Sequence, residues 1–299
     1  MNILTRKESI KWAIHELGQS GLYFGHGPHN ARDEAVWALL NVLNKSNGET
    51  VRNLDKEMSR DEQTRFNDII QKRTETRQPL AYLLNEAWFA GLKFYVNPDV
   101  LVPRSPLAEI ILDKFTPWLK INSDANILEL CTGSGCIAIS IATHLPQSRV
   151  TASDISGKAL KVAERNLEIH DLAGRIQLYN SDLYKNIPRE KYDLIISNPP
   201  YVSLNEYNQL QDEYMHEPRI GLTDEGDGLV LVEEIILGSA DRLNENGYLV
   251  VEVGNTEAIV KSKWPNIPFQ WIHFSNSLSG VFILTYEQVK QLKTPLSAI

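Results

Sequence analysis

The sequence predicts an α/β protein: a small N-terminal helical domain, then a mostly parallel sheet covered by helices on both faces, with an antiparallel last strand. Residues 1–85 show only helical spacing of apolar residues, whereas strand-like and helical runs alternate from about residue 107. The last two strand-like runs, 269–274 and 280–286, are joined by a link too short for a crossover helix, so they should pair antiparallel. We therefore expect a helical domain at 1–85, a hairpin linker at 86–104 and a sheet domain at 105–299.

In the helical domain, capping signals mark where helices begin. Thr5 with Glu8, and Ser59 with Glu62, have the capping-box spacing ahead of an apolar helical stripe. A further helix should start near Asn30, which precedes another such stripe. These short amphipathic helices predict a small bundle with a core of its own.

The bulk composition is that of an ordinary globular protein. The 299 residues are 42% hydrophobic and 23% charged, and no apolar run approaches the roughly 20 residues that cross a bilayer. The opening MNILTRKESIKW has no apolar signal-peptide core, and two cysteines, Cys131 and Cys136, are too few for a disulfide scaffold. We therefore expect a reduced, cytoplasmic protein with no membrane segment.

Charge is unevenly distributed along the chain. Residues 1–90 hold 12 basic and 12 acidic side chains, so the remaining residues carry the whole net charge of -8. This balance provides no basic stripe to hold nucleic acid by its phosphates, and an acidic catalytic half favours a basic partner. The seven histidines are scattered and none is paired at metal-ligand spacing, so no metal is expected.

Glycines and acids follow the strand-like runs of the sheet domain. After the first run comes Glu129-Leu-Cys-Thr-Gly-Ser-Gly135, where Gly133 and Gly135 allow a sharp turn and a close approach of backbone to ligand. Asp154 ends the second run, where a carboxylate accepts both hydroxyls of a ribose, and Asp182 ends the third, placed to meet an adenine ring. Because the carboxyl ends of parallel strands share one crevice, the glycine turn and the two aspartates together predict a nucleoside site. The expected strands are 126–130, 149–153, 176–180, 192–197 and 248–253.

The residue before the glycine turn narrows the choice of nucleoside. A dinucleotide would place its pyrophosphate at the helix N-terminus, where Glu129 would repel it. S-adenosylmethionine has ribose and adenine but no phosphate, and its α-amino group and sulfonium are cationic. The sequence therefore predicts S-adenosyl-L-methionine as the cofactor.

The fourth run ends in Asn198-Pro-Pro-Tyr201, an unusual strand terminator. Proline cannot donate to a sheet ladder, so Pro199 and Pro200 must lie beyond the strand. With the glycine turn and the two strand-end aspartates, this motif resembles the class I S-adenosylmethionine-dependent methyltransferases. The helical front domain, the hairpin and the motif together resemble the protein-glutamine N5-methyltransferase family, over essentially the whole chain.

The resemblance implies methylation of a glutamine side-chain nitrogen, with catalytic roles for Asn198, Pro199 and Tyr201. The Asn198 side-chain oxygen and the Pro199 carbonyl would accept hydrogen bonds from the target NH₂. Pro200 would help to aim that carbonyl, and Tyr201 would offer its ring face to the amide. Cys131 stands where the family usually has its first glycine; its small side chain should fit, and we expect an inert thiol. The implied cofactor contacts are Glu129, Cys131, Gly133, Gly135, Asp154, Asp182 and Asn198.

The family has two branches that differ in substrate. One methylates the Gly-Gly-Gln motif of peptide-chain release factors, and the other a glutamine in large-subunit ribosomal protein L3. Leu101-Val-Pro-Arg-Ser-Pro106 and Glu217-Pro-Arg-Ile-Gly-Leu222 resemble the second branch, which implies a basic ribosomal-protein partner, free or in assembling ribosomes. Adenine-N6 methylation of nucleic acid uses a similar motif but would need a flipped base and basic residues along its backbone, which the net acidity disfavours.

Two features have more than one interpretation. Residues 202–228 are long for a loop in a compact domain and predict a lid or a substrate platform. Arg104 would either face the methionine carboxylate of the cofactor or form a surface ion pair.

Overall fold

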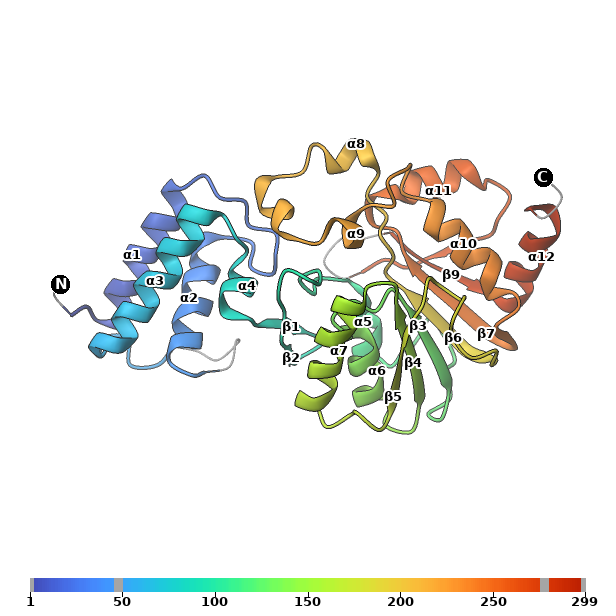
Figure 1. Cartoon of the computed structure of the whole chain (residues 1–299), viewed down its shortest axis with the longest axis horizontal. Helices are drawn as coiled ribbons and strands as arrows, with labels where there is room; N and C mark the ends of the chain where they lie inside the picture. Colours follow the sequence, from blue (N-terminus) through green and yellow to red (C-terminus); the bar gives the residue numbers. More distant parts are fainter. Residues whose placement is uncertain (1–2, 46–50, 275–279, 297–299) are drawn as a thin grey trace.

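The structure is a computed structural model that describes residues 3–45, 51–274 and 280–296. The chain forms a group of N-terminal helices, a short hairpin and a seven-stranded sheet with helices on both faces (Figure 1). The strand order is β5-β4-β3-β6-β7-β9-β8; β3 to β7 are parallel, and β9 runs antiparallel to both of its neighbours. The predicted fold class is confirmed. None of the helices in the described part of the chain combines the length and apolarity needed to cross a membrane.

The strand bounds agree closely with the sequence pattern at the start of the sheet and less well at its end. β7 begins earlier than predicted, because it pairs with β6 both before and after a turn-like Asn-Glu-Asn-Gly stretch. Leu243, before the stretch, opposes Tyr192, and Tyr248, after it, opposes Leu194. The antiparallel pairing of the last two runs is confirmed, although β8 is shorter than its run and the link at 275–279 lies outside the described residues. The strands are β3 (Asn126–Leu130), β4 (Arg149–Asp154), β5 (Ile176–Asn180), β6 (Tyr192–Ser197), β7 (Leu243–Glu252), β8 (Gln270–Trp271) and β9 (Val281–Thr285).

Side chains alternate between two apolar layers, one on each face of the sheet. Ile127 and Ile196 belong to the layer that contains the buried residues of α5 (Leu107–Leu112) and α6 (Cys136–His144). Leu128 and Ile195, their neighbours in sequence, pack with α10 (Val230–Ser239) and α12 (Tyr286–Leu296). Helices α7 (Gly157–Ile169) and α11 (Glu257–Lys263) complete the sheet domain. With both faces covered, the strands present their carboxyl ends to a ligand.

Four helices form the N-terminal group: α1 (Arg6–Gln19), α2 (Ala31–Val42), α3 (Arg60–Thr76) and α4 (Leu80–Leu84). Both predicted capping boxes are present, and Asn30 is the N-cap of α2. The sequence pattern missed α4, because this helix has five residues and begins after Pro79 without a side-chain cap.

The N-terminal helices bury a core separate from the two layers of the sheet, as predicted, but this core extends beyond the helices. Their buried cluster also contains Val96, Val100 and Val102, which follow the hairpin β1 (Ala87–Phe89) and β2 (Leu92–Phe94), and two residues of α7. Asn166 of α7 strengthens this connection: its Oδ1 accepts from the Tyr95 amide at 2.7 Å, and its Nδ2 donates to the Tyr95 and Ser134 carbonyls. The end of the hairpin is thereby joined to the glycine turn.

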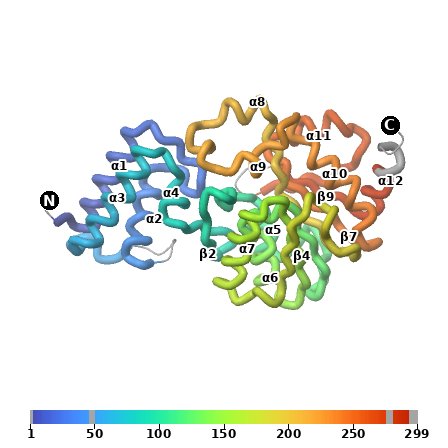
Figure 2. The backbone as a smooth tube through the Cα atoms, viewed as in Figure 1, coloured from blue at the N-terminus to red at the C-terminus, as the bar shows by residue number. Residues whose placement is uncertain are grey.

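Residues 202–228 are structured rather than an open loop. They contain α8 (Leu204–Tyr207), the 3₁₀ helix η1 (Asp212–His216) and α9 (Arg219–Leu222). Figure 2 shows this segment lying between the N-terminal helices and the sheet domain. Glu213 accepts from the Tyr23 amide at 2.9 Å and Glu217 accepts from the Val102 amide at 2.9 Å, so the segment is tied both to the N-terminal region and to the chain that follows the hairpin.

Candidate active site

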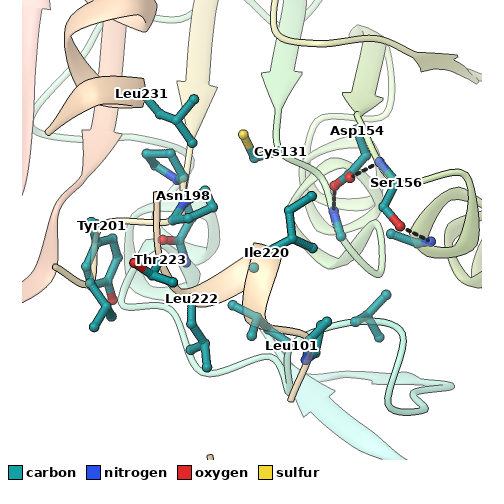
Figure 3. Close-up of a pocket in the computed structure, with 18 of the residues that line it drawn as sticks. Leu101, Cys131, Asp154, Ser156, Asn198, Tyr201, Ile220, Leu222, Thr223 and Leu231 are labelled. Atoms are coloured by element: carbon teal, nitrogen blue, oxygen red, sulfur yellow. Dashed lines mark hydrogen bonds between the residues drawn. The ribbon is translucent and has the colours of Figure 1, made fainter. Parts of the chain in front are cut away.

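A cavity of about 970 Å³ lies at the carboxyl ends of the parallel strands. In Figure 3, Asp154 and Ser156 lie on one side of it, Asn198 and Tyr201 on the other, and Cys131 between them. Segments 99–106 and 218–225 close the remaining wall. The predicted residues that line the cavity are Cys131, Gly133, Asp154, Asp182, Asn198, Pro199, Pro200 and Tyr201, whereas Glu129 and Gly135 lie behind its wall.

The two glycines of the turn serve different purposes. Gly133 has φ +55°, and a Cβ added to it would meet nothing within 4 Å, so its surface is open to the cavity. Gly135 has φ +79°, and a Cβ there would lie 3.2 Å from the Cβ of Ala163 in α7. Gly133 therefore leaves space for a ligand, whereas Gly135 allows α6 and α7 to pack closely.

Asp154 shapes the turn as well as facing the cavity. Its Oδ2 accepts from the Gly133 amide and its Oδ1 from the Ser156 amide, both at 2.8 Å (Figure 3). Burial raises the pKa of Asp154, and the two backbone amides oppose this effect. A carboxylate has about four lone-pair sites, so two remain for hydroxyl donors in the cavity. Asp182, at the neighbouring strand end, is half-exposed and pairs with Lys185 at 2.6 Å.

Glu129 lies in a different place from the one predicted. It is fully buried behind the turn, where its Oε2 accepts from the Thr132 hydroxyl at 2.6 Å and from the Ala138 amide at 2.9 Å. Burial raises its pKa to about 8, against the effect of these two hydrogen bonds. Glu129 thus ties the turn to the start of α6, and only its Oε1 has no partner among the described residues.

Cys131 has φ +59°, the left-handed conformation that favours glycine. This backbone geometry explains why a glycine would suit the position. Burial raises the pKa of the Cys131 thiol far above its ordinary value, so the sulfur stays protonated and a poor nucleophile.

The Asn198-Pro-Pro-Tyr201 motif begins where β6 ends. The preceding Ser197 donates to the Leu130 carbonyl at 2.9 Å and joins the ends of β6 and β3. In the described part of the chain, no hydrogen bond is made by the Asn198 side chain or to the Pro199 carbonyl, and both residues line the cavity. Two hydrogen-bond acceptors are therefore available side by side.

Tyr201 is held firmly at the edge of the cavity. Its hydroxyl donates to Glu252 Oε1 at 3.1 Å, and burial keeps its pKa well above the ordinary value. A Cβ added at Gly254 would lie 2.5 Å from the ring, so only glycine lets the chain pass there.

Sequence reasoning missed one acid that lines the cavity and the partner of a second acid beside it. Glu252 ends β7 and lines the cavity, and its position after an apolar strand repeats the signal given by Asp154. The Glu217 side chain is fully buried outside the cavity wall and binds Arg104 through two hydrogen bonds, Nη1–Oε1 at 2.6 Å and Nη2–Oε2 at 2.7 Å. Arg104, which is 28% exposed and lines the cavity, therefore forms a half-buried ion pair, and no sequence pattern indicated its partner.

The sheet order, with its antiparallel β9, and a cavity bounded by a glycine turn and strand-end carboxylates define a class I S-adenosylmethionine-dependent methyltransferase. The family described as "Methyltransferase small domain" matches residues 109–263, and "PrmC N-terminal domain" matches residues 8–84. The hMettl16 catalytic domain, in complex with a MAT2A 3′UTR hairpin, shares the fold: 17% identity, 75% of this chain and 81% of that chain covered, and a TM-score of 0.50.

Two curated relatives are similar over nearly the whole chain. The "Ribosomal protein uL3 glutamine methyltransferase" of Francisella tularensis is 38% identical over 293 residues, which cover 98% of this chain and 93% of that protein. The protein of the same name from Neisseria gonorrhoeae is 38% identical over 288 residues, 96% of each chain. The chain belongs to the family of ribosomal protein uL3 glutamine methyltransferases, and its methyl donor is S-adenosyl-L-methionine.

The cavity fits this cofactor. The open space beside Gly133 leaves room for a ligand to approach the backbone, and Asp154 keeps acceptor sites for ribose hydroxyls. The apolar and small residues between them, including Cys131, leave a surface against which an adenosyl group packs.

Proposed function

We propose that this chain transfers a methyl group from S-adenosyl-L-methionine to the N5 side-chain nitrogen of a glutamine in ribosomal protein uL3. Two relatives named for that activity, each 38% identical over nearly the whole chain, support this substrate. The observation that carries the reaction type is the unpaired carboxamide of Asn198, which lines the cavity beside the Pro199 carbonyl.

These two acceptors address the main difficulty of the reaction. An amide nitrogen is a poor nucleophile, because its lone pair is delocalised into the carbonyl group. The cofactor, when bound, supplies an electrophilic methyl group on a sulfonium. Asn198 Oδ1 and the Pro199 carbonyl accept the two hydrogens of the target NH₂, fix the direction of the nitrogen lone pair and favour the positive charge that develops on nitrogen.

Neighbouring residues complete the substrate site. Pro200 is buried and restricts the backbone that aims the Pro199 carbonyl. The Tyr201 ring flanks the amide and stabilises a developing cation through its face. The methylated amide cation loses its proton readily to water, so no side chain has to act as a general base before transfer.

The cofactor residues follow from their places on the cavity wall. Asp154 accepts the ribose hydroxyls, Asp182 meets the adenine, and Gly133 lets the cofactor approach the turn. Cys131 contributes packing, and Asn198 borders both cofactor and substrate. Glu129 and Gly135 act indirectly, because they hold the turn in shape from behind.

The partner is a basic protein that meets the enzyme in the cytoplasm, free or in assembling ribosomes. The helical domain (1–85) docks this substrate, the linker (86–104) connects it to the sheet domain (105–299), and the acidic sheet domain attracts basic residues near the target. The net charge of -8 supports a substrate recognised as protein, without direct readout of nucleic acid.

The test is transfer of radiolabelled methyl from S-adenosylmethionine to purified substrates. Ribosomal protein uL3, free and in assembling particles, is compared with a release factor carrying Gly-Gly-Gln. We expect label on uL3 that disappears when its target glutamine is changed to alanine. Label on the release factor alone would preserve the chemistry and refute the substrate. Label on neither protein, with label on an adenine-containing nucleic acid, would refute the protein-glutamine function.

A further inference from the structure

Glu252, the last residue of β7, has no role in the function proposed above although it lines the same cavity. Its side chain is almost completely buried, with 3% of the residue exposed. Its Oε1 accepts from the Tyr201 hydroxyl at 3.1 Å, and its Oε2 makes a short hydrogen bond with the Ser105 hydroxyl. Both partners are neutral, and no ion pair to Glu252 occurs among the described residues.

A buried carboxyl group without an ion-pair partner destabilises the fold more than a neutral side chain would, although here it links β7 to the segments that contain Ser105 and Tyr201. Arg104, the nearest guanidinium in sequence to Ser105, forms its ion pair with Glu217 and acts on Glu252 only from a distance, without a hydrogen bond between them. Burial raises the pKa of Glu252 to about 7, against the effect of the hydrogen bonds from Ser105 and Tyr201 and of the charge on Arg104. Ionisable groups that are buried at this cost concentrate where a protein needs their chemistry or their geometry.

The geometry points to Tyr201 as the group that Glu252 serves. The Tyr201 ring is confined on one side by Gly254, where a Cβ would lie 2.5 Å from the ring. Its hydroxyl is confined by Glu252, so both the plane and the far end of the ring are fixed. Burial keeps the Tyr201 hydroxyl protonated, and it therefore acts as the donor in this contact.

We propose that Glu252 is a positioning residue for methyl transfer, which accepts the hydroxyl of Tyr201 and so holds the aromatic ring against the target amide. A hydrogen bond from a phenol to a carboxyl oxygen also increases the electron density of the ring, most strongly when the carboxyl group is ionised. The ring face then stabilises more strongly the positive charge that moves onto the nitrogen in the transition state. No proton is transferred, and Glu252 acts only through Tyr201. The proposal rests on the function proposed above.

The test uses Glu252→Leu, which keeps the side-chain size but removes the acceptor, and Tyr201→Phe, which removes the donor. We expect each to lower kcat by about 100-fold, as a misplaced active-site group does, while the Kd for S-adenosylmethionine changes less than about threefold. Glu252→Gln keeps a neutral acceptor and should recover at least about tenfold of that loss. Glu234→Gln, an exposed glutamate on α10, is the matched control and should match the wild type.

The double variant distinguishes positioning from a general structural role. If Glu252 acts through Tyr201, adding Glu252→Leu to Tyr201→Phe should lower kcat by less than about threefold more. A multiplicative loss in the double variant, full kcat in Tyr201→Phe, or a loss confined to cofactor affinity would overturn the proposal. Tyr201→Phe keeps the test decisive even if Glu252→Leu does not fold. Each variant is measured on whichever substrate the wild type methylates, so failure of the uL3 assignment is seen separately in the wild-type enzyme.

Discussion

Replacing Glu217 with glutamine should destabilise the fold and reveal what holds the 202–228 segment in place. The Glu217 side chain is fully buried; its Oε1 accepts from the Val102 amide at 2.9 Å, and both oxygens bind Arg104. His26 Nε2 lies 3.4 Å from Oε2. The substitution keeps the size of the side chain but leaves the Arg104 guanidinium without its counter-charge.

The lowered pKa of Glu217 and the typical cost of breaking a buried ion pair give a similar loss of folding free energy. Burial alone would raise the pKa of Glu217, but Arg104 and His26 more than offset this and lower it from 4.5 to about 2. At 1.36 kcal/mol for each pKa unit, this corresponds to ~3 kcal/mol of stabilisation of the folded state. Removing one partner of a buried ion pair typically costs 3–5 kcal/mol, and because the Arg104 side chain is 28% exposed the lower end of this range applies.

The assay is urea unfolding of the wild type and of Glu217→Gln at pH 7 and at pH 3. A depressed carboxyl pKa contributes stability that is present above the unfolded-state pKa and lost as the pH falls towards 2, so the difference should be about 3 kcal/mol at pH 7 and smaller at pH 3. The double variant Glu217→Leu with Arg104→Met should be more stable than Glu217→Gln, because it buries no unpaired charge. A difference below about 1 kcal/mol at pH 7, or one that does not change with pH, would refute the reasoning.

Three other predictions address the turn and the catalytic motif. Asn198→Ala should lower kcat by about 10²–10³-fold while calorimetry shows S-adenosylmethionine affinity within several-fold of the wild type; weak cofactor binding with normal turnover at saturation would contradict this. Asp154→Ala should mainly weaken cofactor binding, and an unchanged Kd would mean that the ribose contact is misplaced. In the wild type, the pKa of Glu129 is raised from 4.5 to about 8 in the folded state, so the protonated side chain stabilises the fold. This stabilisation is complete below about pH 4.5 and is lost as the pH rises through 8. Glu129→Gln should remove that loss, so the difference in Tm between pH 6 and pH 9 should shrink; an unchanged difference would argue against a buried, neutral Glu129.

Local signals in the sequence predicted much of the fold. The capping boxes at Thr5 and Ser59 and the strands 126–130 and 192–197 depend on residues close together in the chain, and the structure has them at those positions. The earlier start of β7 was not predictable in this way. Its first residues pair with Tyr192 across a bulge, and an Asn-Glu-Asn-Gly stretch signals a turn whether or not a neighbouring strand is present.

The part of the cavity wall that is formed by residues at strand ends could be predicted from the sequence. Asp154 and Asn198 follow buried strands, Asp182 follows the half-exposed β5, and parallel pairing brings these strand ends to one edge of the sheet. Glu129 differs because its side chain points to the backbone of the next helix, a choice made by the three-dimensional turn. Sequence position fixes which strand end a residue occupies, but packing decides whether its side chain faces the cavity or the core.

The 202–228 segment, whose length predicted a lid or a substrate platform, has few buried apolar side chains. Two of its buried side chains are charged: Glu213 is bound by Arg77 at 2.8 Å and Glu217 by Arg104, while Met215 and Ile220 are about half exposed. The arginines come from elements more than 100 residues earlier in the chain, so no window of neighbouring residues contains both partners. Ion pairs also require fixed geometry, because an unpaired buried charge costs several kcal/mol. The segment is therefore held against the helical domain and the cavity by a few specific contacts, which explains how a stretch with little apolar core forms a defined wall of the active site.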